Sequence, residues 1–222
     1  MKRNVTLEEI SDGRLYQLND MVKADCHGCQ GCSQCCRGMG QSIILDPLDV
    51  YHLTKGLHTE LSQLIETAVE LNVVDGVILP NLRMTGSEEV CAFLNAEGRC
   101  SVHAFRPGIC RLFPLGRYYE NGSFQYFLQT GECTEKVRSK VKVSKWIDTA
   151  DLPHNQAFVN TWHYLLNQVE ELINSSTDDD FCRNLNMFLL QTFYLTPYDK
   201  ESDFYGQFEE RLQRFRKIVP EA

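Results

Sequence analysis

Cysteine is concentrated in the first half of the chain, and the spacing of these cysteines suits metal binding. Five of the ten cysteines fall in one short run between Cys26 and Cys36. Within it, Cys29, Cys32 and Cys35 follow one another at a spacing of three residues, which lets a tight loop turn several sulfurs toward one ion or cluster. Glycines between the cysteines relieve the backbone of steric limits. The run therefore predicts a thiolate site for a metal.

Four more cysteines lie between residues 91 and 133, and several of them sit in short motifs with glycine or arginine. Together with the first run, these motifs resemble the CxxCxxCC (YkgJ-like) family of zinc- or iron-chelating cysteine-cluster proteins, over about residues 26–135. The resemblance rests on Cys29-x-x-Cys32-x-x-Cys35-Cys36, Gly98-Arg99-Cys100, Arg106-Pro107-Gly108-Ile109-Cys110 and Gly131-Glu132-Cys133. The eight cysteines shared in that family imply eight metal ligands here: Cys29, Cys32, Cys35, Cys36, Cys91, Cys100, Cys110 and Cys133.

Eight thiolates are enough for two metal sites, because tetrahedral zinc and a cubane cluster each take four sulfurs. In extended backbone the neighbouring side chains of Cys35 and Cys36 would point apart, so they would serve different metals or one would bridge. Three cysteines at successive spacings in one loop are closer to a ferredoxin-type segment than to paired zinc knuckles, although the ferredoxin Cys-Pro ending is missing. An iron–sulfur cluster is therefore favoured over zinc by a small margin, and a mixed pair stays open.

Three further side chains near the cysteines stay open as ligands. Cys26, three residues before Cys29, extends the run beyond the motif and stays open as a ninth, auxiliary thiol. His27, inside the run, and His103, three residues after Cys100, could each replace a cysteine. Cys182 lies in an apolar helical stripe and is predicted to be a small buried hydrophobe.

The charge of the chain is uneven. A formal net charge of −8 argues against nucleic acid as a partner, whereas residues 99–145 carry a local net charge of +6. This basic excess coincides with the second group of cysteines. Arg106 and Arg111 flank Cys110 and can donate hydrogen bonds to sulfur or offset the negative charge of a thiolate site. A solvated basic face is the alternative.

The chain has no apolar stretch of the roughly 18 residues that a membrane helix needs, and its first residues are charged. These features predict a cytoplasmic protein without a membrane partner. Reducing conditions there would keep the thiols free for metal. A disulfide framework is the alternative, and the absence of an export signal and the adjacent Cys35-Cys36 pair argue against it.

Capping signals and apolar periodicity predict helices on both sides of a region of turns. Thr6-x-x-Glu9 and Asp46-Pro47 mark helix starts, and Asn121-Gly122 marks the turn of a hairpin. The expected helices are residues 48–55, 59–72, 158–173, 181–193 and 208–218, and the expected hairpin is residues 115–128. The fold is therefore expected to be α+β, with a hairpin-rich cysteine-cluster half packed against N-terminal and C-terminal helices. The predicted domains are residues 1–145, which bind metal, and residues 146–222, which are helical.

The family resemblance implies metal or iron–sulfur binding, with metal ions as partners and no assigned wider role. Whether there is also a protein partner stays open. Three alternatives stay open: a SAM-dependent protein lysine methyltransferase like the flagellin lysine N-methylases of that family, a redox enzyme using the cluster, and a metal carrier or store. No catalytic residue can be named. Gly38-Met39-Gly40 lacks the third glycine of a dinucleotide-binding loop, and Met39 stands where a radical-SAM triad has its third cysteine.

Overall fold

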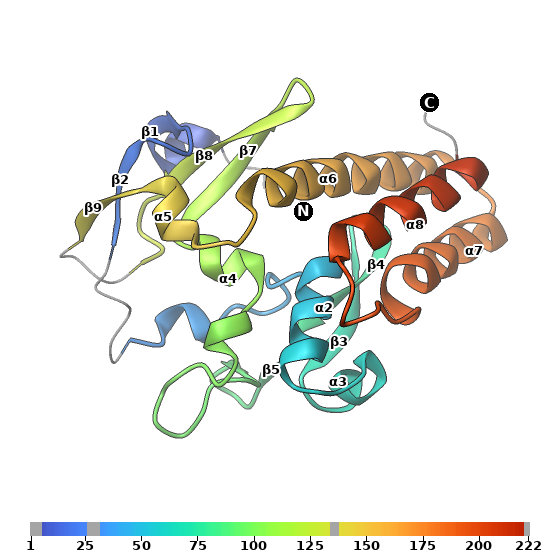
Figure 1. The fold of residues 1–222 in the computed structure, drawn as a ribbon, viewed down its shortest axis with the longest axis horizontal. Coiled ribbons are helices and arrows are strands. Elements are labelled where there is room, and N and C mark those ends of the chain that lie inside the picture. The colour runs from blue at the N-terminus through green and yellow to red at the C-terminus, as the bar shows by residue number, and fades with distance from the viewer. Residues whose placement is uncertain (1–5, 26–31, 134–137, 220–222) are drawn as a thin grey trace. The chain divides into compact units, whose positions relative to one another are not determined.

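A computed structural model describes residues 6–25, 32–133 and 138–219 (Figure 1). The chain forms two compact units, each made of separate stretches of sequence. The first, called the cysteine unit, contains the described residues up to 40 and residues 84–160; the second, called the helical unit, contains residues 41–83 and 161–219. The predicted division into residues 1–145 and 146–222 stays a prediction.

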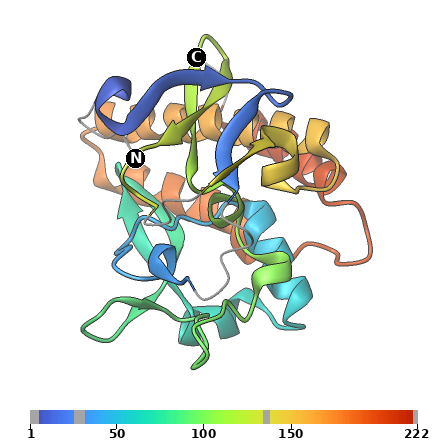
Figure 2. The same ribbon diagram turned by 90° about the vertical axis from the view of Figure 1, so that its left-hand side faces the viewer.

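The cysteine unit is built from short antiparallel strands. Strands β1 (Ser11–Tyr16), β8 (Ser123–Gln129) and β7 (Leu115–Glu120) form a three-stranded sheet in that order, and β2 (Met21–Asp25) pairs with β9 (Ser139–Lys142) (Figure 2). Strands β5 (Met84–Thr85) and β6 (Val90–Cys91) form a third, very short pair. The helices of this unit are α1 (Leu7–Ile10), the 3-10 turns η2 (Gln34–Cys36) and η3 (His103–Phe105), α4 (Gly108–Leu112), α5 (Val143–Ile147) and the start of α6 (Leu152–Ser175).

One apolar core lies beneath the β2–β9 and β7–β8 pairs. Val22, Ala24 and Val143 are almost completely buried in it, together with Leu115 and Tyr126. In β2 buried and exposed side chains alternate, because successive side chains of a strand point to opposite sides. The hydrophobic burial holds the short strands, which would be marginal as isolated hairpins.

The hairpin predicted at residues 115–128 is confirmed as β7 and β8. Its turn residues Asn121 and Gly122 have positive φ angles of 51° and 74°, as a type I′ turn requires. Gly116 in β7 faces the ring of Phe127 so closely that a Cβ atom would overlap it. Glycine is therefore required at this strand position for a packing reason.

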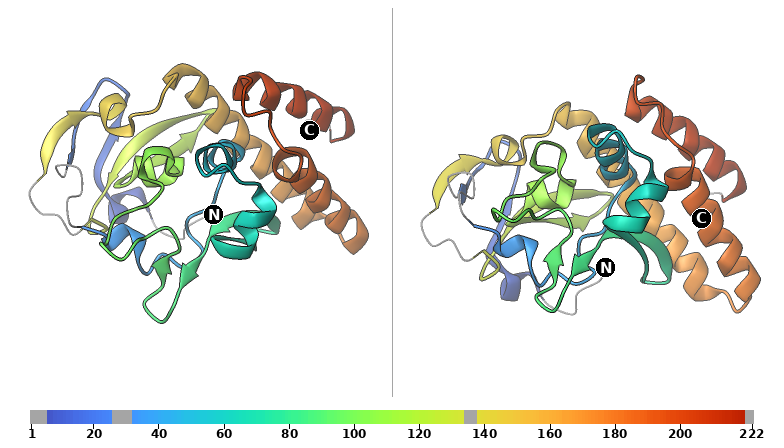
Figure 3. Two further views of the ribbon diagram at one scale, coloured as in Figure 1. Left: turned by 60° about the horizontal axis from the view of Figure 1, so that its bottom comes forward. Right: turned by 90° about the horizontal axis from the view of Figure 1, so that it is seen from below.

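The helical unit contains two helices and a hairpin from the first half of the chain and three helices from the second (Figure 3). Helix α2 begins after Asp46, whose side chain accepts a hydrogen bond of 2.8 Å from the Asp49 N–H, as the capping signal predicted. The elements are α2 (Pro47–Gly56), α3 (Leu61–Thr67), β3 (Val69–Val74), β4 (Val77–Leu82), the rest of α6, α7 (Asp179–Leu190) with the π-helical turn η4 (Gln191–Leu195), and α8 (Phe204–Ile218).

The helix predicted over residues 59–72 is wrong in its second half. Helix α3 ends at Thr67, and Val69–Val74 forms strand β3, which pairs with β4 through the turn at Asp75 and Gly76. The β-branched residues here favour a strand, and pairing with β4 supplies the backbone hydrogen bonds that a helix would otherwise make. The three helices predicted near the C-terminus are confirmed as α6, α7 and α8.

Aromatic side chains form the core of the helical unit. The Trp162 and Phe193 ring centroids are 5.1 Å apart, and Phe193 lies 5.4 Å from Phe215, with all three side chains buried. The aromatic stripes of the sequence are thus packing residues. The α+β class, with small antiparallel hairpins and C-terminal helices, is confirmed. None of the described helices has the length and apolar composition to cross a membrane.

Candidate metal centre

Backbone pairing brings the end of the cysteine run to the β5–β6 hairpin. Cys35 and Cys36 lie in the 3-10 turn η2, and the next residue, Arg37, forms an isolated antiparallel bridge with Val90. The Gly38 N–H donates a 3.0 Å hydrogen bond to the Glu89 carbonyl and extends this contact. Because Cys36 and Cys91 are each one residue away from the bridge, the pairing places both cysteines at the same point of the unit.

A tight loop returns the chain from Cys91 to Cys100. Leu94 and Cys100 form a second isolated bridge, and the Ser101 N–H donates a 2.8 Å hydrogen bond to the Phe93 carbonyl. The loop between them is closed at Asn95, whose N–H donates to the Arg99 carbonyl at 2.9 Å. These main-chain contacts, with side-chain hydrogen bonds of Asn95 and Ser101, hold Cys100 near Cys91.

The four thiols of Cys35, Cys36, Cys91 and Cys100, here called the four-thiol cluster, influence the ionisation of one another. A hydrogen bond from the Cys36 thiol holds the pKa of Cys35 down to about 7. That same hydrogen bond raises the pKa of Cys36, with burial and the nearby Cys35, Cys91 and Cys100 adding to the effect. Burial raises the pKa of Cys91 and of Cys100, and neighbouring thiolates add to it. Without a cation, the negative charge of one ionised thiol therefore raises the pKa of the remaining thiols.

The 3-10 turn at Cys35 and Cys36 changes one expectation from the sequence. Extended backbone would direct the two side chains apart, whereas the turn lets their thiols share a hydrogen bond. The expected divergence is therefore wrong for the described conformation, and both sulfurs face the same set of neighbours.

Main-chain donors support two of these sulfurs. The N–H of Phe93 hydrogen-bonds the Cys91 thiol, and the N–H of Val102 hydrogen-bonds the Cys100 thiol, each from two residues further along the chain. Both interactions lower the thiol pKa, because a donor favours the thiolate. Hydrogen bonds to sulfur are the outer-shell contacts that metal–thiolate sites use. The residue types at Phe93 and Val102 carry no signal of this role, so the sequence did not predict it.

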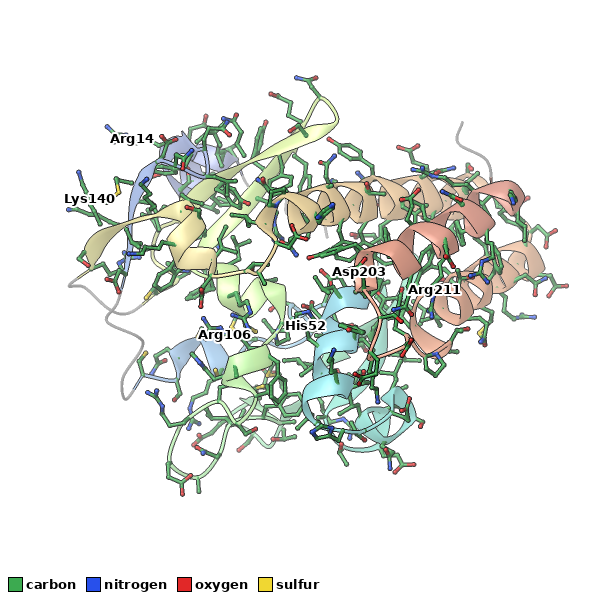
Figure 4. The ribbon with its side chains drawn as sticks, viewed as in Figure 1. Arg14, His52, Arg106, Lys140, Asp203 and Arg211 are labelled. Carbon is green, nitrogen blue, oxygen red and sulfur yellow. The ribbon has the colours of Figure 1, made fainter. Side chains whose placement is uncertain are left out.

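Arginine supplies the positive charge beside the cluster. Arg106 follows η3, contacts His103 through its guanidinium, and lowers the pKa of both Cys35 and Cys100 (Figure 4). The Arg106 Nε atom is buried and has no hydrogen-bond partner among the described residues. An unpartnered buried donor next to four thiols fits a negatively charged metal–thiolate group.

His103 lies in a cationic setting. Burial lowers the pKa of His103, and the nearby Arg106, Arg99 and Arg111 lower it further. Arg111 is itself held by the main chain, because it donates to the carbonyls of Ala104 and Asp148. The basic excess predicted for this part of the sequence is thus partly gathered next to the thiols.

The other predicted ligands are described only in part. Cys32, Cys110 in α4, and Cys133 are partly exposed thiols, while Cys29 lies outside the described residues, as do Cys26 and His27. All described cysteines are free thiols, which leaves the disulfide alternative without support there. In the described ranges no three His, Cys, Asp or Glu side chains already have the geometry to hold a metal ion. The four thiols are neighbours and not a closed ligand sphere.

Cys182 is not part of the cysteine unit. It belongs to α7 of the helical unit, and its sulfur lies 3.7 Å from the Ile173 carbonyl oxygen. Its thiol is half-buried. This position agrees with a packing role, and it makes Cys182 a suitable control cysteine.

Comparison with curated proteins and with solved structures finds no match. The family model CxxCxxCC, described as a "putative zinc- or iron-chelating domain", matches residues 28–142, which is more than half of the chain. That match covers the cysteine run, the β5–β6 hairpin, the loop to Cys100 and the β7–β8 hairpin. The chain therefore belongs to the CxxCxxCC family of zinc- or iron-chelating cysteine domains.

Proposed function

We propose that the protein binds zinc or iron through cysteine thiolates, and that Cys35, Cys36, Cys91 and Cys100 hold one metal site together. The observation that carries this proposal is the mutual effect of the four thiols on ionisation, which links each of them to the other three. A cation among them would offset the repulsion between neighbouring thiolates, because it stabilises all four thiolates at once. The N–H donors at Phe93 and Val102 and the unpartnered Arg106 Nε support the same site.

A second site would use the remaining predicted ligands, Cys29, Cys32, Cys110 and Cys133. Four thiolates suffice for a zinc ion or for a cluster. The support for this second set is the family's cysteine pattern and the loop spacing of the run. The two-site arrangement uses all eight predicted cysteines and leaves none of them unassigned.

The proposal favours an iron–sulfur cluster over zinc by a small margin. Three cysteines at successive spacings of three residues in one loop support the cluster, and hydrogen bonds from main-chain N–H groups to sulfur are suited to either metal. A cytoplasmic location belongs to the same proposal, because reducing conditions keep eight thiols available for metal.

The experiment is to purify the protein without oxygen and to measure iron, zinc and acid-labile sulfide together with the visible spectrum. The unsubstituted chain is compared with Cys100→Ser, which removes a ligand of the four-thiol cluster, and with Cys182→Ser, which removes a thiol of the helical unit. We expect Cys100→Ser to lose about half of the bound metal, because the two four-thiolate sites would bind independently. Cys182→Ser should keep all of its metal.

Iron with matching sulfide and a brown colour would identify an iron–sulfur protein, whereas zinc in a colourless sample would identify a zinc protein. Two results would contradict the proposal: metal at trace levels in the unsubstituted chain, or equal metal content in the Cys100→Ser and Cys182→Ser variants. In either case the cysteines would have another role.

A further inference from the structure

The β2–β9 pair presents a lysine-rich face to solvent. Met21 pairs with Lys142, and Val22 pairs with Val141. Val22 is buried and Val141 packs against the core, so the alternate residues lie on the opposite, exposed face. This face, here called the lysine ribbon, consists of Met21, Lys23, Lys140 and Lys142, and Lys145 follows in α5. Figure 4 labels Lys140 on β9, at the left-hand side of the view.

Among the residues that the structure describes, no carboxylate pairs with the lysines of the ribbon. No ion pair or side-chain hydrogen bond within the described residues involves Lys23, Lys140, Lys142 or Lys145. Some cations elsewhere are paired, for example Lys200 with Glu60 at 2.9 Å. The nearest acidic residue of β2, Asp25, accepts a 2.9 Å hydrogen bond from the Ser139 hydroxyl.

This positive charge stands out against an acidic chain. Residues 138–145 contain four cations and no acidic residue. Because the whole chain has a net charge of −8 and this stretch contributes +4, the rest of the chain carries −12. An excess of acid leaves many carboxylates in the chain, yet among the described residues none forms an ion pair with these lysines. A surface kept positive under these conditions is suited to a negatively charged partner.

We propose that the lysine ribbon binds an acidic segment of a protein partner, lying extended along β9. Side chains on one face of a strand repeat about every 7 Å, so alternate carboxylates of an extended segment can meet Lys140 and Lys142 in turn. In the described part of the chain, β9 pairs only with β2, which leaves its other edge for main-chain pairing with such a segment.

The composition of the ribbon favours a protein over a nucleic acid. Met21 is 49% exposed at its centre, and methionine is enriched in protein interfaces. The face carries no aromatic side chain on which a base could stack. This inference does not depend on the metal.

The test uses a fluorescein-labelled oligoglutamate peptide, with oligothymidylate of equal charge as the second probe, and measures fluorescence anisotropy at low salt. The variants are Lys142→Glu, the double variant Lys140→Glu with Lys142→Glu, and the control Lys217→Glu. Lys217 is exposed in α8 of the helical unit. We expect the double variant to weaken peptide binding about tenfold, because two small attractive charge contacts are replaced by repulsive ones. The control should change peptide binding less than about twofold, because Lys217 is not part of the lysine ribbon.

A second measurement needs no substitution. Lysine acetylation of the unsubstituted protein, read by mass spectrometry, should be slowed at Lys140 and Lys142 by the peptide and unchanged at Lys217. Preference for oligothymidylate would overturn the proposed partner. The proposed site would be overturned by equal peptide binding in Lys142→Glu and Lys217→Glu together with no protection of Lys140 and Lys142 from acetylation. The lysines would then serve to keep the edge strand from pairing with another chain and aggregating.

Discussion

Replacing Cys36 with alanine tests the hydrogen bond at the centre of the four-thiol cluster. In the metal-free protein the Cys36 thiol donates to the Cys35 sulfur and holds the pKa of Cys35 down to about 7, against an ordinary value of 9.0. Cys36→Ala removes the donor, while the burial that raises the pKa of Cys35 remains. The pKa of Cys35 should therefore return toward 9.0.

The expected effect on reactivity follows from the thiolate fraction. At pH 7 this fraction falls from about one half to about 1%, or about fiftyfold, when the pKa rises by two units. A more basic thiolate is also the better nucleophile, which returns a factor of roughly six to ten over two units. Alkylation of Cys35 at pH 7 should thus be about five to eight times slower in the variant. Above about pH 9 the variant should react faster, so the two pH–rate curves cross near pH 8.

The assay is a pH series of iodoacetamide alkylation on reduced, metal-free protein. Tandem mass spectrometry separates Cys35 from its neighbour in the unsubstituted chain, and Cys182→Ala serves as the control. Curves for Cys35 that coincide in the Cys36→Ala variant and in the unsubstituted chain would refute the reasoning. Faster alkylation of Cys36 than of Cys35 at pH 7 would refute it as well, because the donor and acceptor would then be exchanged.

Three further predictions concern stability. The free energy of unfolding of the metal-free protein should fall as the pH rises above about 8.5. The reason is that three of the four cluster thiols have raised pKa values in the folded protein, so the unfolded chain ionises first. The lowered pKa of the fourth thiol acts in the opposite direction, and equal urea midpoints at neutral and alkaline pH would contradict the predicted net fall. Cys91→Ser should reduce the rise in melting temperature on adding metal, because only the second site then binds metal in the folded state, whereas Cys182→Ser should retain the full rise. Gly116→Ala should cost about 1–3 kcal/mol in urea unfolding, since the new Cβ overlaps the Phe127 ring; adding Phe127→Leu should recover part of this, and strictly additive losses would speak against the overlap.

Much of the fold could be predicted because its signals are local. The Asn121-Gly122 turn, the Asp46 cap and the aromatic stripes near the C-terminus each depend on residues a few positions apart, and each prediction agrees with the structure. The helix expected over residues 59–72 failed where the decision was not local. Val69–Val74 satisfies its backbone groups by pairing with β4, and an apolar pattern of this length is compatible with either element.

The sequence by itself determined that this is a cysteine-cluster protein of the CxxCxxCC family, because the types and spacing of the cysteines define that pattern. Only the tertiary structure decided which thiols become neighbours. Cys36 meets Cys91 through the bridge between Arg37 and Val90, a contact between segments far apart in the chain. The 3-10 turn, and not the extended backbone that the sequence suggested, turns Cys35 and Cys36 toward each other. Long-range pairing and local backbone conformation are set by the packing of the whole unit, and spacing along the chain carries no record of them.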